Sequence, residues 1–129
     1  MSLLFIRFDI LILILMKNIL VVGTGTIGEP LIGLLAQHKE KLGIDNISFF
    51  KRTPLSDEKG KVEALIRKGA KLVATSEAKN DFESMGFEVE DLEKSYEENQ
   101  VIIDCTPSGN KNWDEIYSNL DKDKRFLAQ

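Results

Sequence analysis

Residues 18–28 read Asn-Ile-Leu-Val-Val-Gly-Thr-Gly-Thr-Ile-Gly, and this stretch decides the fold. Its first half, 18–22, is a short apolar run rich in β-branched residues, which is typical of a buried parallel strand. Its second half places three glycines in the spacing G-x-G-x-x-G. Apolar residues at helical spacing follow, and Pro30 stands at a first-turn position where its missing N–H costs nothing. The stretch therefore predicts a strand, a tight glycine loop and a helix.

The loop has the features that bind a dinucleotide. Gly23 permits the tight turn, Gly25 lets the backbone approach a pyrophosphate, and Gly28 lets the helix and strand pack closely. Free N–H groups and the helix dipole then attract the anion without a basic side chain. A Walker loop is excluded, because no Gly-Lys-Ser/Thr follows. A glycine turn that binds nothing is the alternative. The expected cofactor contacts in the loop are Gly23, Thr24, Gly25, Thr26, Ile27 and Gly28.

Apolar and amphipathic segments alternate along the rest of the chain. We expect strands at 46–50, 72–74, 101–105 and 125–128, and helices at 61–68, 77–85, 89–97 and 113–120. We also expect Gly43 to end the first helix and Ser76 to cap the helix at 77–85. Alternating elements of this length indicate right-handed crossovers and a parallel sheet. With the glycine loop, the pattern predicts an α/β fold with a Rossmann-type doubly wound sheet over 16–129.

The carboxyl-terminal end of this sheet is expected to be incomplete. A strand begins near Arg125 and the sequence stops at Gln129, before a helix could cover the far half of the sheet. A doubly wound sheet needs helices on both faces. We therefore expect a missing catalytic domain or a homo-oligomeric partner to cover the exposed part. Taken alone, the chain is predicted to catalyse no reaction.

Composition excludes several classes of function. The 129 residues suffice for one domain, but not for a cofactor domain together with a full substrate domain. A net charge of −4 gives no general attraction to nucleic acid, so we expect no such partner. The single cysteine, Cys105, and the single histidine, His38, exclude an internal disulfide and a zinc cluster. This cysteine usage suits a reducing cytoplasm.

Residues 1–15 are strongly apolar and precede a conventional strand. A transmembrane helix needs about 20 apolar residues, whereas the uninterrupted run is 10–16 and charged residues at 7 and 9 precede it. No small-residue cleavage site of a signal peptide follows. We interpret Met16 as the natural start and 1–15 as a non-native or disordered extension. A membrane anchor is the less favoured alternative.

Basic residues follow the second expected strand. An NAD-preferring site places an Asp or Glu there to hold the ribose 2′-hydroxyl, whereas this chain has Lys51-Arg52-Thr53-Pro54. A carboxylate repels a 2′-phosphate and an Arg fork attracts one. Lys51, Arg52 and Thr53 therefore favour NADP, with NAD tolerated. Two solvated cations at a strand end are the alternative.

A second loop follows the strand at 101–105 and reads Asp104-Cys-Thr-Pro-Ser-Gly109. It leaves the carboxyl end of a strand, the edge where ligands bind in open parallel sheets. Thr106 offers a hydroxyl, Pro107 stiffens the turn, and Gly109 allows close approach of the backbone. A purely structural turn has the same features. We do not expect Cys105 to be a nucleophile, because buried Cys usually acts as a small hydrophobe and no histidine is near it in sequence.

Four segments together resemble the amino-terminal domain of archaeal-type (class II) glyceraldehyde-3-phosphate dehydrogenase. They are Gly25-Thr-Ile-Gly28, Lys51-Arg-Thr-Pro54, the stretch 78–89, and Ile102-Ile-Asp-Cys-Thr-Pro-Ser-Gly109. The last is the most specific. Two features depart from the family: the order Lys-Arg-Thr-Pro differs from the commoner Lys-Thr-Arg/Lys-Pro, and no second glycine soon follows Gly109.

The resemblance implies oxidation of glyceraldehyde 3-phosphate to an acyl phosphate, with hydride transfer to NADP or NAD. It implies cofactor contacts at Thr26, Ile27 and Gly109, and adenosine-ribose contacts at the basic residues of 51–53. The family's nucleophilic cysteine and its histidine partner would lie beyond Gln129. Two other functions remain open. One is another two-domain oxidoreductase of the homoserine or dihydrodipicolinate type, and the other is a nucleotide-sensing module without chemistry.

Overall fold

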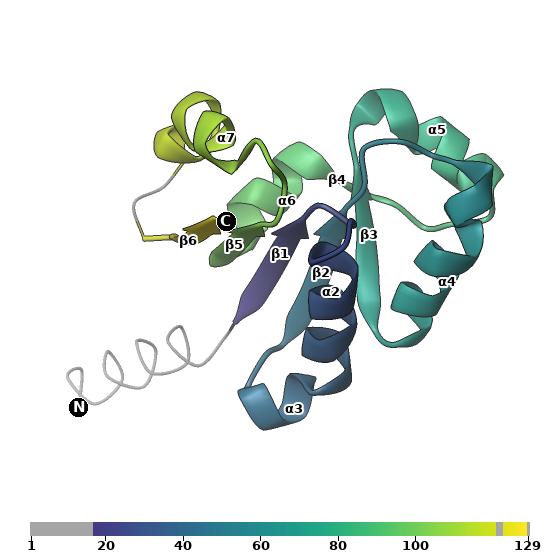
Figure 1. Cartoon of the computed structure of the whole chain (residues 1–129), viewed down its shortest axis with the longest axis horizontal. Helices are drawn as coiled ribbons and strands as arrows, with labels where there is room; N and C mark the ends of the chain where they lie inside the picture. The colour runs from purple at the N-terminus through teal and green to yellow at the C-terminus, as the bar shows by residue number, and fades with distance from the viewer. Residues whose placement is uncertain (1–16, 121–122, 129) are drawn as a thin grey trace, which may run out of the picture.

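A computed structural model describes residues 17–120 and 123–128 of the chain. The extension expected at 1–15 lies outside the described residues. Six parallel strands form one sheet in the order β4-β3-β2-β1-β5-β6 (Figure 1). The strands are β1 (Asn18–Val22), β2 (Asn46–Phe50), β3 (Ala70–Ala74), β4 (Glu90–Asp91), β5 (Val101–Asp104) and β6 (Arg125–Ala128). The predicted α/β parallel-sheet fold is thereby confirmed.

The order of the strands reverses at β1. From β1 the chain adds β2, β3 and β4 on one side, and then returns to add β5 and β6 on the other side. Val22, the last residue of β1, stands in register with Phe50 of β2 and Asp104 of β5. The loops that leave these three strands therefore meet at one edge, which is the place where open α/β sheets bind ligands.

Helices cover both faces of the sheet. The helical segments are α2 (Gly28–Gln37), α3 (Lys39–Leu42), η1 (Ser56–Glu58), α4 (Lys59–Arg67), α5 (Ser76–Ser84), α6 (Leu92–Glu98), α7 (Gly109–Glu115) and η2 (Tyr117–Asn119). Val21 faces a core shared with α2, α4 and α5, whereas Leu20 faces a second core with α6 and η2. This alternation along β1 follows from the two-residue period of a strand. The sheet is doubly wound, as predicted.

The expectation that no helix would cover the far half of the sheet was wrong for one face: α6 and η2 pack on the Ile102 face of β5, whereas Val101 and Ile103 on the other face are only half-buried. Tyr96 of α6 and Tyr117 of η2 are buried against Ile102 of β5, and the partly buried Phe126 of β6 packs against the same cluster. The segments expected as helices at 89–97 and 113–120 supply this cover, but the sequence pattern does not specify that they pack on β5 and β6. None of the described helices is long and apolar enough to cross a membrane.

Several boundaries differ from those expected. The first helix breaks at His38, and α3 continues to the Gly43 cap at φ 66°. Thr75, not Ser76, caps α5, because its hydroxyl accepts from the N–H of Ala78. Residues 90–91 form β4 instead of a helix, since they extend the sheet beside β3. Helix α4 starts two residues earlier than predicted, and α7 starts at residue 109 rather than 113.

Candidate functional site

A pocket of about 530 Å³ lies at the carboxyl edge of the sheet, between the loops that follow β1, β2 and β5. Seven of the predicted cofactor residues line it: Gly23, Thr24, Lys51, Arg52, Thr53, Thr106 and Pro107. The other five are not among its lining residues: Gly25, Thr26, Ile27, Gly28 and Gly109. The pocket wall continues over α6, α7 and the start of η2 with Leu92, Tyr96, Asn112, Ile116 and Tyr117. The fold thus brings together the glycine loop, the basic segment and the second loop.

The three glycines of the first loop have different surroundings. Gly23 has φ +106°, which L side chains rarely adopt. A Cβ on Gly28 would lie 2.0 Å from the carbonyl oxygen of Gly23, so only glycine fits this close contact. Around Gly25, by contrast, no heavy atom of the described residues beyond its two chain neighbours lies within 4 Å of an added Cβ, and its φ is not in the left-handed range. The space in front of Gly25 is therefore open to a ligand.

The amino terminus of α2 lies beside this open space. Within 17–120 and 123–128, no side chain caps α2, and the first amide bonded back to the loop is that of Glu29, 3.1 Å from Gly25 O. Thr26 and Ile27 are exposed. Uncapped N–H groups and the positive end of the helix dipole favour an anion at this position.

The second loop is fixed by Asp104, whose residue surface is only 1% exposed. Its Oδ1 accepts hydrogen bonds from the N–H of Thr106 at 2.8 Å and from the Thr106 hydroxyl at 2.5 Å. Its Oδ2 accepts from Asn112 at 2.8 Å and from the Tyr117 hydroxyl at 2.6 Å. Burial raises the pKa of Asp104, but these hydrogen bonds outweigh burial and hold the pKa below its ordinary value. The loop is therefore held by a buried carboxylate.

Sequence reasoning missed this role of Asp104 and the contributions of Asn112 and Tyr117. The available signal was an acidic residue at the end of an apolar strand, since a carboxylate is rarely buried without partners. The hydroxyl of Thr106 was predicted to face a ligand. Because it already donates to Asp104, it can offer a ligand only its acceptor lone pairs.

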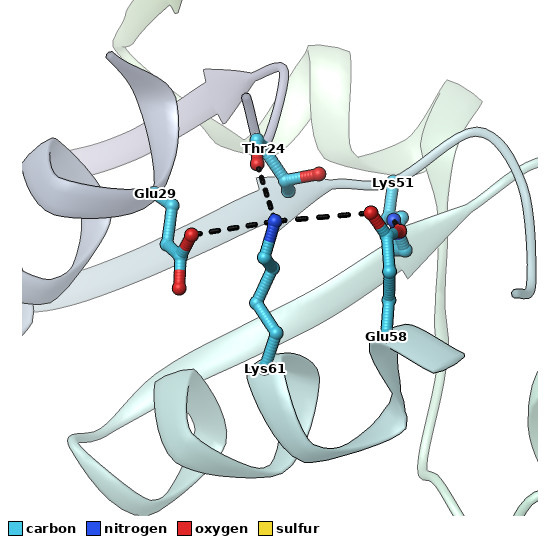
Figure 2. A network of polar contacts seen from close by, with 5 residues as sticks. All are labelled: Thr24, Glu29, Lys51, Glu58 and Lys61. Atoms are coloured by element: carbon cyan, nitrogen blue, oxygen red, sulfur yellow. Dashed lines mark hydrogen bonds and ion pairs between the residues drawn. The ribbon is translucent and has the colours of Figure 1, made fainter. Parts of the chain in front are cut away.

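The basic segment forms a network with α4 and the glycine loop (Figure 2). Lys51 is buried, and its ammonium group forms an ion pair with Glu58 at the end of η1. The Nζ atom of Lys61 lies 3.7 Å from Oε1 of Glu58, 3.3 Å from Oε2 of Glu29 and 3.5 Å from the carbonyl oxygen of Thr24. The hydrogen bond from Lys51 lowers the pKa of Glu58, against the effect of its partial burial.

Sequence reasoning missed Glu58 and Lys61. The helix was expected to begin only at residue 61, whereas η1 and the first turn of α4 bring both side chains to the carboxyl edge. Arg52 and Thr53 are exposed and line the pocket, as a contact to a cofactor requires.

Cys105 and His38, the one cysteine and the one histidine of the sequence, lie on different elements. Cys105 is half-buried after β5, and burial together with the charge of Asp104 raises the pKa of its thiol. His38 lies at the opposite end of α2 from the glycine loop. No group of His, Cys, Asp and Glu within the described ranges could hold a metal ion.

Neither a protein-family model nor a curated protein matches this chain.

Proposed function

We propose that residues 16–129 form the dinucleotide-binding unit of a cytoplasmic oxidoreductase that prefers NADP over NAD. One observation carries the proposal: the glycine loop after β1 and the loop at 105–109 flank the pocket where the strand order reverses. In this class of fold, a dinucleotide lies across that point. The open space at Gly25 and the uncapped start of α2 support a pyrophosphate there.

The remaining pocket residues suit the two halves of the cofactor. Arg52 and Thr53 are exposed at the end of β2, where the adenosine ribose of a bound dinucleotide would lie. A guanidinium group can hold a 2′-phosphate through two hydrogen bonds. Thr106 and Pro107, rigidly held beside β5, would contact the other ribose and the nicotinamide end.

The resemblance to class II glyceraldehyde-3-phosphate dehydrogenase supports a specific reaction. The enzyme would oxidise an aldehyde to an acyl phosphate and transfer the hydride to NADP or NAD. Such chemistry needs an activated nucleophile and a domain that places the substrate beside the nicotinamide. We propose that a catalytic domain outside residues 16–129 supplies both, and that the protein works as a homo-oligomer.

Calorimetric titration with NADP and NAD at matched low salt tests the binding proposal. We expect both to bind, and NADP to bind about tenfold more tightly. No binding of either cofactor would contradict the assignment of a dinucleotide site. Reduction of NADP with glyceraldehyde 3-phosphate and phosphate tests the reaction, and we expect none from residues 16–129 alone.

A further inference from the structure

We propose that Glu58 limits the preference of this site for a 2′-phosphate by holding the ammonium group of Lys51 away from it. This inference rests on the proposed function, because it concerns the adenosine end of the same pocket. It differs from the reading of the sequence, in which Lys51 and Arg52 act together. In the structure, Glu58, the partner of Lys51, lies on η1, six residues after Arg52.

The ammonium group of Lys51 is already paired inside the pocket wall. Lys51 directly follows β2 and lines the pocket, yet only 7% of its side chain is exposed. Its ammonium group pairs with Oε2 of Glu58. A buried ammonium group that is already paired gains little from a second anion, since the new contact must compete with the carboxylate. Lys51 therefore contributes little to phosphate binding while Glu58 is ionised.

Lys61 holds the Glu58 carboxylate in place. The Nζ atom of Lys61 is 3.7 Å from Oε1 of Glu58, so the two carboxylate oxygens face two different lysines (Figure 2). Lys61 is in turn held by Glu29 and by the carbonyl group of Thr24. The carboxylate is thus fixed between α2, the glycine loop and the end of β2.

The charges of this network balance one another. Glu29, Glu58, Lys51 and Lys61 sum to zero, so the network itself offers no net attraction to a phosphate. Among the described pocket-lining residues, Arg52 is the exposed cation, and no ion pair of it is seen in the described part of the chain. Removing the charge of Glu58 would leave a net positive network and would free Lys51 to turn toward the pocket.

The test compares two probes that differ only in the 2′-phosphate, 2′,5′-ADP (adenosine 2′,5′-bisphosphate) and 5′-AMP. Their dissociation constants are measured by calorimetry at fixed pH and low salt. In Glu58→Gln we expect the preference for 2′,5′-ADP to rise about fivefold or more. Glu63→Gln is the matched control, because it removes the same charge from α4, where Oε1 of Glu63 lies 3.9 Å from Nζ of the exposed Lys59, its one ion pair among the described residues. The control should leave the preference unchanged.

The double variant Lys51→Met with Glu58→Gln identifies the group that binds. The gain of Glu58→Gln should disappear when Lys51 is also removed. An unchanged preference in Glu58→Gln, an equal rise in Glu63→Gln, or a gain that survives the loss of Lys51 would each overturn the inference. If Glu58→Gln fails to fold, Glu58→Asp replaces it, because the shorter side chain keeps the charge but withdraws it from Lys51. An unchanged preference for 2′,5′-ADP in Glu58→Asp would also overturn the inference. If the unmodified chain binds neither probe, the proposed function itself fails.

Discussion

The hydroxyl group of Tyr117 donates a hydrogen bond of 2.6 Å to the buried carboxylate of Asp104. This contact joins η2 to the end of β5, 13 residues apart in sequence. Tyr117 also stacks on Phe126 of β6, with ring centroids 5.5 Å apart. One carboxylate thus connects β5, the second pocket loop and the helical segment that covers this face of the sheet.

We expect Asp104→Asn to destabilise the fold by about 3 kcal/mol. An amide group offers one acceptor oxygen in place of two, so the donors of Thr106 and Tyr117 cannot both be satisfied. Urea denaturation of both proteins measures the effect. Tyr117→Phe is the control, because it removes one donor and leaves the carboxylate intact, at a cost of about 1 kcal/mol. Equal losses in the two variants would show that Asp104 has no central role.

The same carboxylate gives a pH dependence. Hydrogen bonds hold the pKa of Asp104 below its ordinary value in the folded state, although burial opposes them. A group with a lowered folded pKa stabilises the fold above its unfolded pKa, about 4, and this contribution is lost as the pH falls through the folded pKa. Stability should therefore decrease below about pH 4, and decrease less in Asp104→Asn. Urea midpoints at several pH values measure both slopes, and parallel curves would contradict the prediction.

Substitution of Gly25 should abolish cofactor binding, whereas substitution of Gly28 should disrupt the fold of the first loop. Gly25→Val should abolish dinucleotide binding without unfolding the chain, because the added side chain enters open space where the pyrophosphate would lie. Gly28→Ala should instead disrupt the loop, since its Cβ would lie 2.0 Å from the Gly23 carbonyl oxygen. Thermal melting and cofactor titration separate the two effects. A folded Gly25→Val variant that binds normally would place the pyrophosphate elsewhere.

The fold was predictable from short-range patterns. The apolar run at 18–22, the glycine loop and the strand pattern at 101–105 predicted β1 and β5, and these patterns are visible without any tertiary information. β4 was missed because a two-residue strand has no period, and its pairing with β3 depends on tertiary contact. Strand boundaries such as Ala70 were displaced for the same reason.

The candidate site was predictable only in part. Residues attached to the ends of strands, such as Arg52 and Thr106, could be located because parallel strands end at one edge. The side chains that contact these strand-end residues could not be located from the sequence. Glu58 reaches Lys51 through the 3₁₀ turn of η1, and Tyr117 reaches Asp104 through α7 and η2. Such contacts depend on how helical segments pack, which the pattern of one sequence does not specify.

Arg52→Ala should reduce or remove the preference for NADP. Arg52 is exposed at the pocket, and among residues 17–120 and 123–128 no ion pair occupies its guanidinium group, in contrast to the ammonium group of Lys51. We expect the affinity for NADP to fall about tenfold at low salt and that for NAD to change less. Arg67→Ala, near the end of α4 and away from the pocket lining, controls for the loss of one charge. A preference that survives Arg52→Ala would exclude Arg52 as the 2′-phosphate ligand.

The thiol of Cys105 should react slowly at neutral pH and should not be needed for cofactor binding. Burial and the neighbouring charge of Asp104 raise the pKa of Cys105, and only the thiolate is nucleophilic. A disulfide reagent should therefore modify the folded protein more slowly than it modifies free glutathione, and denaturation should remove the difference. In Asp104→Asn the rate should rise, because one of the two causes of the raised pKa is gone. Cys105→Ser should bind NADP as the unmodified chain does. Rapid modification of the folded protein, together with aldehyde oxidation that is lost in Cys105→Ser, would instead identify Cys105 as the nucleophile.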